Sequence, residues 1–176
     1  MIRKPNLDEF IVCDILDLAQ DTFTQKLFCE DDELKKMQVF YKFYGNDKCR
    51  FALDNIFVYE IDKNIVAACC AYGSSEYSDL AIEEYLLYKG IDFKIIKEFD
   101  DGEFYIDSIA ILPDFRGKGI LKKMLEYANI KAKNNGYKII SLITKTPEFY
   151  KNYGFKTIKE TNFNDEIYLK MIKNID

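Results

Sequence analysis

The sequence predicts an α/β fold in which helices flank a mixed, mainly antiparallel sheet of six or seven strands. Two apolar runs, Ile56–Ile61 and Ile65–Tyr72, are separated only by Asp62-Lys63-Asn64, which favours an antiparallel hairpin. Two further runs, Glu103–Leu112 and Lys138–Thr144, flank a segment whose apolar residues have helical spacing. Strand, helix and strand in this order form a right-handed unit, so these two strands are expected to be parallel.

Composition and charge exclude several classes of function. The chain has 176 residues and is expected to form a single domain, 1–176. It has five cysteines without a C-x-x-C pair and no histidine, so we expect no metal site and no Ser-His or Cys-His nucleophile. The net charge of -5 argues against nucleic-acid binding, which needs a concentrated basic face. No apolar segment reaches the length of a membrane span, and no signal region is evident, so we expect no membrane partner and a cytoplasmic location.

Two helices are predicted in the first 45 residues. Asn6 and Glu9 resemble a capping box, which predicts a helix from about Asn6 to Gln20. The residues expected on its core face are Leu7, Phe10, Ile11, Ile15 and Leu18. The acidic start at Asp31 predicts a helix to Tyr44, and the segment between the two favours a short helical turn. The core face of this later helix is expected to contain Leu34, Met37, Tyr41 and Tyr44.

A long connection, from about 74 to 102, separates the hairpin from the central strand. Ser78 is placed to cap a helix that runs through Leu87 and ends at Gly90. A connection of this length between two strands is usually functional or mobile. We interpret it as a helical insertion that acts as a lid or shapes an acceptor site; a helix that only covers the sheet edge is the alternative.

The central strand leads directly into a turn that contains two glycines. The strand is followed by Pro113, then by Arg116-Gly117-Lys118-Gly119, and helical spacing begins at Ile120 and continues to about Asn135. Such a junction leaves backbone N–H groups unpaired at the start of a helix, with the positive end of the helix dipole behind them. The turn therefore predicts an anion site for a phosphate or pyrophosphate.

The C-terminal part predicts one short helix and two strands. Pro147 begins a helix that runs to Tyr153, and Gly154 ends it. The segments FKTIKE and EIYLKMIK have the composition of strands and complete the predicted sheet.

Two motifs in combination, P-x-x-R-G-x-G-I and FYKNYGF, resemble those of the GNAT superfamily of N-acetyltransferases. The resemblance extends from the hairpin onward. It implies that backbone N–H groups of the turn bind the pyrophosphate of acetyl-CoA, and that the strand before it separates from its neighbour in a V beside Ile109 to admit the pantetheine. Leu121 stands where the family usually has Gly or Ala, so we expect the helix to lie slightly further from the phosphates. The cofactor-binding residues implied are Ile109, Ile111, Arg116, Gly117, Lys118, Gly119, Ile120, Leu121 and Lys122.

Two side chains are candidates for catalysis. The resemblance implies that Tyr150, or less favourably Tyr153, protonates the leaving thiolate. The acceptor amine must lose a proton, and without histidine a carboxylate acting through water is the available route. We therefore name Asp107, on the strand face of Ile109 and Ile111, as base or acceptor anchor. A packing role for Tyr150 and a structural role for Asp107 are the alternatives, and the fallback anchors are Glu103, Glu83 and Glu84.

The resemblance implies an enzyme that moves an acetyl group from acetyl-CoA to a primary amine of a small molecule or peptide by direct attack. One alternative is a non-enzymatic acyl-CoA-binding or sensing module, motivated by Leu121 and the absence of histidine. A second is a tRNA-directed acetyltransferase toxin, which the acidic composition disfavours. A third keeps the enzyme but changes the acyl group. The sequence does not identify the acceptor, and a homodimer through the last strands is compatible with the family.

Overall fold

The computed structural model describes residues 1–20, 22–163 and 166–175. The helices are α1 (Ile11–Asp17), α2 (Phe23–Phe28), α3 (Glu33–Phe43), α4 (Leu80–Tyr88), α5 (Ile120–Asn134) and α6 (Glu148–Lys151), and short 3-10 turns lie at η1 (Leu53–Asn55) and η2 (Pro113–Phe115). The strands are β1 (Ile2–Arg3), β2 (Ile56–Ile61), β3 (Asn64–Gly73), β4 (Glu103–Ile111), β5 (Ile139–Thr144), β6 (Lys156–Phe163) and β7 (Glu166–Asn174).

Within these residues, seven strands form one sheet in the order β1-β2-β3-β4-β5-β7-β6. β4 and β5 pair in parallel, as predicted for a strand-helix-strand unit. The ladders β1–β2, β2–β3, β5–β7 and β6–β7 are antiparallel. The predicted mixed, mainly antiparallel sheet flanked by helices is therefore confirmed, and the short strand β1 is an element that the sequence did not predict.

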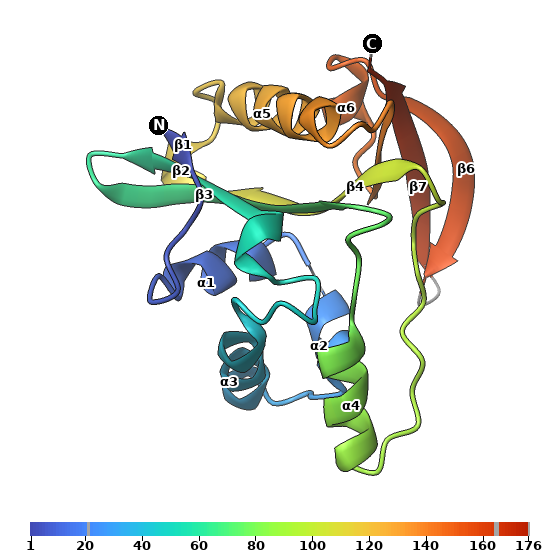
Figure 1. Cartoon of the computed structure of the whole chain (residues 1–176). Coiled ribbons are helices and arrows are strands. Elements are labelled where there is room, and N and C mark those ends of the chain that lie inside the picture. The colour runs from blue at the N-terminus through green and yellow to red at the C-terminus, as the bar shows by residue number, and fades with distance from the viewer. Residues whose placement is uncertain (21, 164–165, 176) are drawn as a thin grey trace. The chain divides into compact units, whose positions relative to one another are not determined.

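The chain packs into two compact units. The first contains Met1–Cys70, Tyr77–Ile96 and Ser108–Ile120, and thus the hairpin and the helices α1 to α4 (Figure 1). The second contains Ala71–Glu76, Lys97–Asp107 and Leu121–Asp176.

The core of the first unit is rich in aromatic side chains. The rings of Phe40 and Phe51 have centroids 4.5 Å apart, and Phe28 stacks on Phe43 at 5.9 Å. All four rings are buried, and they hold α2 and α3 together beside the residues that precede β2. Such aromatic pairs add roughly 0.5–1.5 kcal/mol each beyond the burial of their area.

The predicted core faces of α1 and α3 are only partly correct: Ile15 and Tyr44 are buried as expected, whereas the other predicted residues are not. α1 begins at Ile11 rather than Asn6, because residues 6–10 form a turn in which the Asn6 N–H donates to Glu9 at 2.7 Å. Its predicted residues Leu7, Phe10, Ile11 and Leu18 are 45–58% exposed, whereas Val12, Cys13, Ile15 and Leu16 are fully buried. In α3, Leu34 is 77% exposed and the buried face consists of Lys36, Val39, Phe40 and Phe43.

Lys36 explains why the sequence pointed to the wrong face of α3. Its side chain is 3% exposed, and its ammonium group lies 2.7 Å from Asp17 and 2.9 Å from Glu33. A buried lysine is tolerated when it is paired in this way. The predicted bounds of α3 are close to those observed, and Asp32 caps it by accepting a hydrogen bond from the Lys35 N–H at 3.0 Å.

In the second unit, β4 and β5 pair from Glu103↔Ile139 to Ile106↔Leu142. The last strand, β7, lies between β5 and β6, so the strand before it in sequence is the edge strand. Helix α5 buries Met124, Leu125, Ala128 and Ala132, as its spacing predicted, while Leu121 is only half-buried. In the described ranges no helix is long and apolar enough to cross a membrane.

Candidate active site

The junction between β4 and α5 has the backbone conformation that an anion site needs. Gly117 and Gly119 have φ angles of +73° and +74°, which residues with a Cβ atom rarely adopt. A Cβ atom added to either glycine would meet nothing within 4 Å, so the space beside the turn is open. In the described part of the chain, the N–H groups from Gly117 to Ile120 donate to no backbone carbonyl. They are available at the start of a 15-residue helix.

The turn is held at both of its ends. The N–H of Leu112 donates to the carbonyl of Val66 at 2.9 Å, which ties the start of the turn to β3. The Arg116 Nε donates to the carbonyl of Ile111 at 3.0 Å. Arg116 was predicted to line the pyrophosphate; in the structure its side chain holds the turn against the end of β4.

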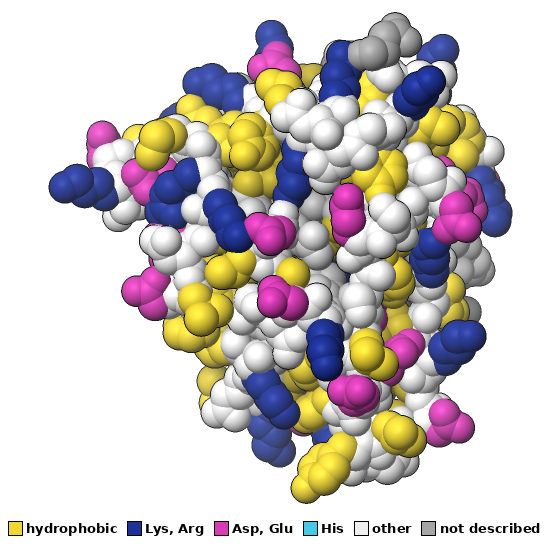
Figure 2. All heavy atoms as spheres, viewed as in Figure 1, with side chains coloured by type: hydrophobic (Ala, Val, Ile, Leu, Met, Phe, Trp, Pro, Cys, Tyr) yellow, Lys and Arg dark blue, Asp and Glu magenta, His cyan; other side chains and the backbone are white. Residues whose placement is uncertain are grey.

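Basic side chains surround the turn. Lys118 is exposed and its ammonium group lies 4.9 Å from the centre of the Phe115 ring. Lys122 is also exposed, and it lies 3.9 Å from Glu126 one turn further along α5. On the face of the molecule in Figure 2, lysine and arginine side chains are interspersed with acidic ones. The basic residues at this turn therefore provide a local rather than a general attraction for anions.

The strand before the turn exposes alternate residues. Asp107, Ile109 and Ile111 are half-buried, whereas Ser108 and Ala110 between them are buried. This period of two places the predicted pantetheine-binding residues Ile109 and Ile111 on the accessible face of β4. The V-shaped separation beside Ile109 stays a prediction.

Asp107 has a specific partner that the sequence analysis missed. The hydroxyl of Tyr72, at the end of β3, donates to Asp107 Oδ1 at 3.0 Å. The two residues are 35 positions apart and both belong to the second unit. The alternative of a structural aspartate therefore includes a tyrosine hydroxyl among the donors to Asp107. The only sequence signal for this partner was an aromatic residue with a hydroxyl group at the end of a buried strand.

Tyr150 lies in α6, also in the second unit, and it is half-buried. Its ring contacts Phe155 edge-on, with centroids 6.0 Å apart. Its carbonyl accepts hydrogen bonds from the N–H groups of both Tyr153 and Phe155, at 2.9 and 3.3 Å. The turn of FYKNYGF thus fixes the backbone of Tyr150.

The structure divides the predicted site residues between the two units. Asp107, Tyr150, Leu121 and Lys122 belong to the second unit. The first unit holds Ile109, Ile111 and the turn residues Arg116 to Ile120. The chain joins the two sets directly, through β4 on one side of the turn and through α5 on the other. Their roles in binding and catalysis stay predictions.

Comparison with known proteins identifies the family to which the motifs point. Residues 52–157 match the family model described as Acetyltransferase (GNAT) domain. This match covers the hairpin, β4, the glycine turn, α5 and the segment that contains Tyr150. No curated protein matches the chain in sequence.

Solved structures of acetyltransferases share the fold along nearly the whole chain. One, described as an acetyltransferase, is 20% identical with a TM-score of 0.77, and the match covers 100% of both chains. An N-acetyltransferase from Staphylococcus aureus Mu50 is 20% identical with a TM-score of 0.74, over 98% of this chain and 99% of its own. A GNAT family acetyltransferase from Elizabethkingia anophelis with acetyl-CoA bound is 17% identical with a TM-score of 0.58, over 99% of this chain and 97% of its own.

Proposed function

Because the chain belongs to the GNAT acetyltransferase family and is therefore an acyltransferase, we propose that it transfers an acetyl group from acetyl-CoA to a primary amine of a small molecule or a peptide. The observation that supports this proposal best is the turn before α5. Two glycines with positive φ, open space beside both, and N–H groups at the helix start are the features that binding of a diphosphate requires. A neighbour of the same fold has acetyl-CoA bound.

In this proposal the backbone binds and the side chains move protons. The N–H groups of Gly117, Gly119 and Ile120 hold the pyrophosphate, and the accessible face of β4 at Ile109 and Ile111 carries the pantetheine. Because a backbone N–H is present whatever the side chain, Leu121 does not remove this binding mode. Lys118 and Lys122 add positive charge near the diphosphate.

The chemical step is direct attack of the amine on the thioester carbonyl. The protonated amine first gives one proton through water to the carboxylate of Asp107, and the neutral amine then attacks and forms the N–C bond. The tetrahedral oxyanion collapses with cleavage of the C–S bond, the departing sulfur takes a proton from the hydroxyl of Tyr150, and the second proton lost by the nitrogen restores that hydroxyl through water. No covalent bond to the protein forms. We propose a cationic acceptor, because an amine near its usual pKa arrives protonated and Asp107 is an acidic group on the accessible face.

Binding and turnover test different parts of the proposal. Isothermal titration with acetyl-CoA measures binding, and release of free thiol measures transfer to each amine of a panel of polyamines, amino acids and peptide amines. We expect binding and amine-dependent thiol release. Binding without release over the whole panel would contradict the transfer reaction and support the sensing module. Comparison of acetyl-CoA with longer acyl-CoAs in the same assay identifies the acyl group.

A matched pair of glycine variants tests the turn itself. Gly119→Ala puts a methyl group into the space assigned to the diphosphate, and we expect acetyl-CoA affinity to fall at least tenfold. Gly136→Ala, at the other end of α5, is the control, because Gly136 has a similar φ of +81° and equally open surroundings. Both variants impose the same kind of backbone strain. An equal effect of the two on affinity would show that the turn is not the binding site.

A further inference from the structure

We infer that Tyr72 is a positioning residue that orients Asp107 for proton transfer, an inference that rests on the function proposed above. The Tyr72 hydroxyl donates to Asp107 Oδ1 at 3.0 Å. Tyr72 is 1% exposed, whereas Asp107 is half-buried and lies on the accessible face of β4. A buried donor thus holds one oxygen of an accessible carboxylate.

Two further rings prevent the Tyr72 side chain from moving. Tyr72 meets Phe99 edge-on with centroids 5.7 Å apart, and it meets Tyr105 edge-on at 6.0 Å. Phe99 stacks on Tyr105 at 5.0 Å, with 23° between the ring planes. Phe99 and Tyr105 are each 4% exposed, so the three rings form a closed cluster. Because edge-on and stacked contacts constrain both the position and the tilt of the ring, the hydroxyl oxygen is held near Asp107.

The position of Phe99 is itself fixed by charged groups. The next residue, Asp100, accepts a hydrogen bond from the Lys170 ammonium at 2.6 Å. Lys170 also lies 3.1 Å from Glu103, whose carboxylate accepts the Asp100 N–H at 3.1 Å. Lys170 is 5% exposed and Glu103 is 5% exposed, so this part of the network is shielded from solvent. The Asp100 side chain itself is 80% exposed, so the shielded support beside Phe99 consists of Lys170 and of Glu103, which binds the Asp100 N–H.

Orientation of the carboxylate is what the reaction requires from this network. An ionised carboxylate has about four lone-pair sites on two oxygens, and the bond from Tyr72 occupies one of them. With Oδ1 held, the rotation of the carboxylate is restricted. The protonated amine then gives a proton through water to Asp107 before the N–C bond forms, and Tyr72 keeps its own proton throughout. Misplacement of a catalytic group by about 1 Å can cost about 10²-fold in rate.

A double-mutant cycle between Tyr72 and Asp107 tests the inference. Tyr72→Phe retains the ring contacts and removes only the hydroxyl, so we expect kcat to fall about tenfold, the worth of one hydrogen bond, while KM and acetyl-CoA affinity stay unchanged. Asp107→Asn should lower kcat further. When Asp107→Asn is already present, Tyr72→Phe should cause no additional loss, because a positioning residue has nothing left to orient.

Tyr137→Phe is the matched control. It also removes one tyrosine hydroxyl from the second unit, where the Tyr137 oxygen lies 2.5 Å from Ser75 Oγ. We expect its kcat to equal that of the unmodified protein. Equal losses from Tyr72→Phe with and without Asp107→Asn, or full activity of Tyr72→Phe, would overturn the inference while the transfer reaction stands. An unmodified protein that binds acetyl-CoA but acetylates no amine would instead overturn the proposed function and this inference together.

Discussion

At the level of single residues, Tyr150 is the most informative position for the chemistry. Tyr150→Phe keeps the ring contact with Phe155 at 6.0 Å and removes the hydroxyl. Because general acid catalysis typically contributes 10²–10⁴-fold, we expect kcat to fall about 10²-fold. Acetyl-CoA affinity should not change, since we propose that the turn at Gly117 and Gly119 binds it through the backbone. Steady-state kinetics and isothermal titration on the same preparation measure both quantities.

Tyr153→Phe is the control for this experiment, because Tyr153 is half-buried in the same turn but was the less favoured proton donor. We expect Tyr153→Phe to retain most of its activity. If Tyr150→Phe turns over as fast as the unmodified protein at every pH, the hydroxyl has no part in the reaction. If instead Tyr153→Phe loses activity and Tyr150→Phe retains it, Tyr153 is the proton donor.

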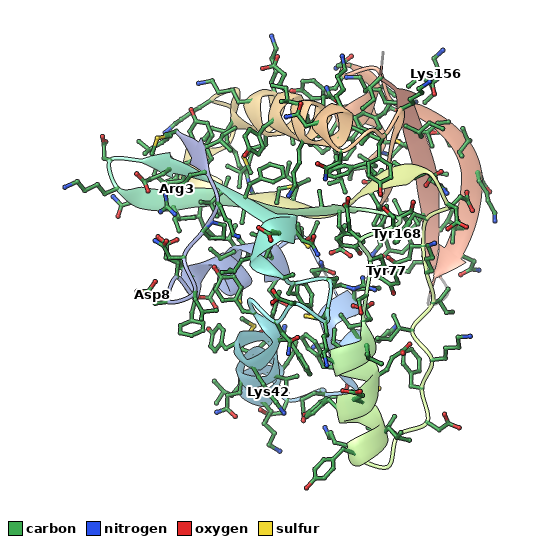
Figure 3. The ribbon with its side chains drawn as sticks, viewed as in Figure 1. Arg3, Asp8, Lys42, Tyr77, Lys156 and Tyr168 are labelled. Atoms are coloured by element: carbon green, nitrogen blue, oxygen red, sulfur yellow. The ribbon has the colours of Figure 1, made fainter. Side chains whose placement is uncertain are left out.

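At the level of elements, a buried ion pair fixes the start of α4. Arg50 is fully buried and its guanidinium donates to Asp79 at 2.6 and 3.0 Å. The centre of the Phe23 ring, in α2, lies 5.3 Å from the guanidinium. Tyr77, which precedes α4 (Figure 3), donates a hydrogen bond from its hydroxyl to Asp79 at 2.7 Å. Burial is the main cause that raises the pKa of Tyr77. The N-terminal end of the insertion is therefore held by an ion pair that is buried on both sides.

Asp79→Ala tests this ion pair. It leaves the Arg50 guanidinium buried without its carboxylate, so we expect the free energy of unfolding to fall by about 3–5 kcal/mol. The double variant Arg50→Met, Asp79→Leu removes both charges and should be clearly more stable than Asp79→Ala. Urea unfolding followed by circular dichroism measures the free energy of unfolding of the unmodified protein, Asp79→Ala and the double variant. A loss below about 1 kcal/mol for Asp79→Ala would show that the pair does not fix α4.

A second ion pair joins β1 to the turn before α1. The guanidinium of Arg3 donates to Glu9 at 2.7 and 2.9 Å and to Glu60 at 2.7 Å. The hydrogen bond from Arg3 is the main cause that lowers the pKa of Glu9 from 4.5. Because the folded-state pKa of Glu9 is depressed, the stabilisation is present above pH 4.5 and is lost as pH falls through the lower, folded-state value.

Glu9→Gln should therefore have an effect that depends on pH. At pH 7 we expect the free energy of unfolding to fall by about 1 kcal/mol, the upper range for partly exposed pairs. In acid below the folded-state pKa of Glu9, the variant and the unmodified protein should be equally stable. Glu84→Gln, on the exposed face of α4, is the control. If Glu9→Gln lowered the free energy of unfolding by the same amount in acid and at pH 7, the result would contradict a charge-based role of Glu9.

At the level of the whole molecule, ligand binding should be visible as stability. A ligand that binds only the folded state stabilises it by about 2.7 kcal/mol at a concentration of 100 Kd. We expect acetyl-CoA to shift the urea midpoint by the amount that its measured Kd requires, without a change in m-value. Gly136→Ala should show the full shift, and Gly119→Ala a reduced one. No shift in the unmodified protein, at a concentration that titration shows to be saturating, would contradict binding to the native fold.

Much of the fold could be read from local patterns. The hairpin of β2 and β3, the parallel pair β4 and β5, and helix α5 depend on periods of 2 and 3.6 and on turn residues, which neighbouring positions encode. The same holds for the turn at Gly117 and Gly119, whose positive φ angles follow from the residue type. The two sequence motifs also identified the family correctly, and both lie within residues 52–157, which match its model.

The sequence by itself determined the order of the main elements, the glycine turn and the family. Only the tertiary structure decided the buried faces of α1 and α3, the place of β7 between β5 and β6, and the bond between Tyr72 and Asp107. The physical reason is separation along the chain. A turn or a helix is specified by residues a few positions apart, whereas Tyr72 and Asp107, 35 residues apart, meet only when the strands that carry them are brought into register.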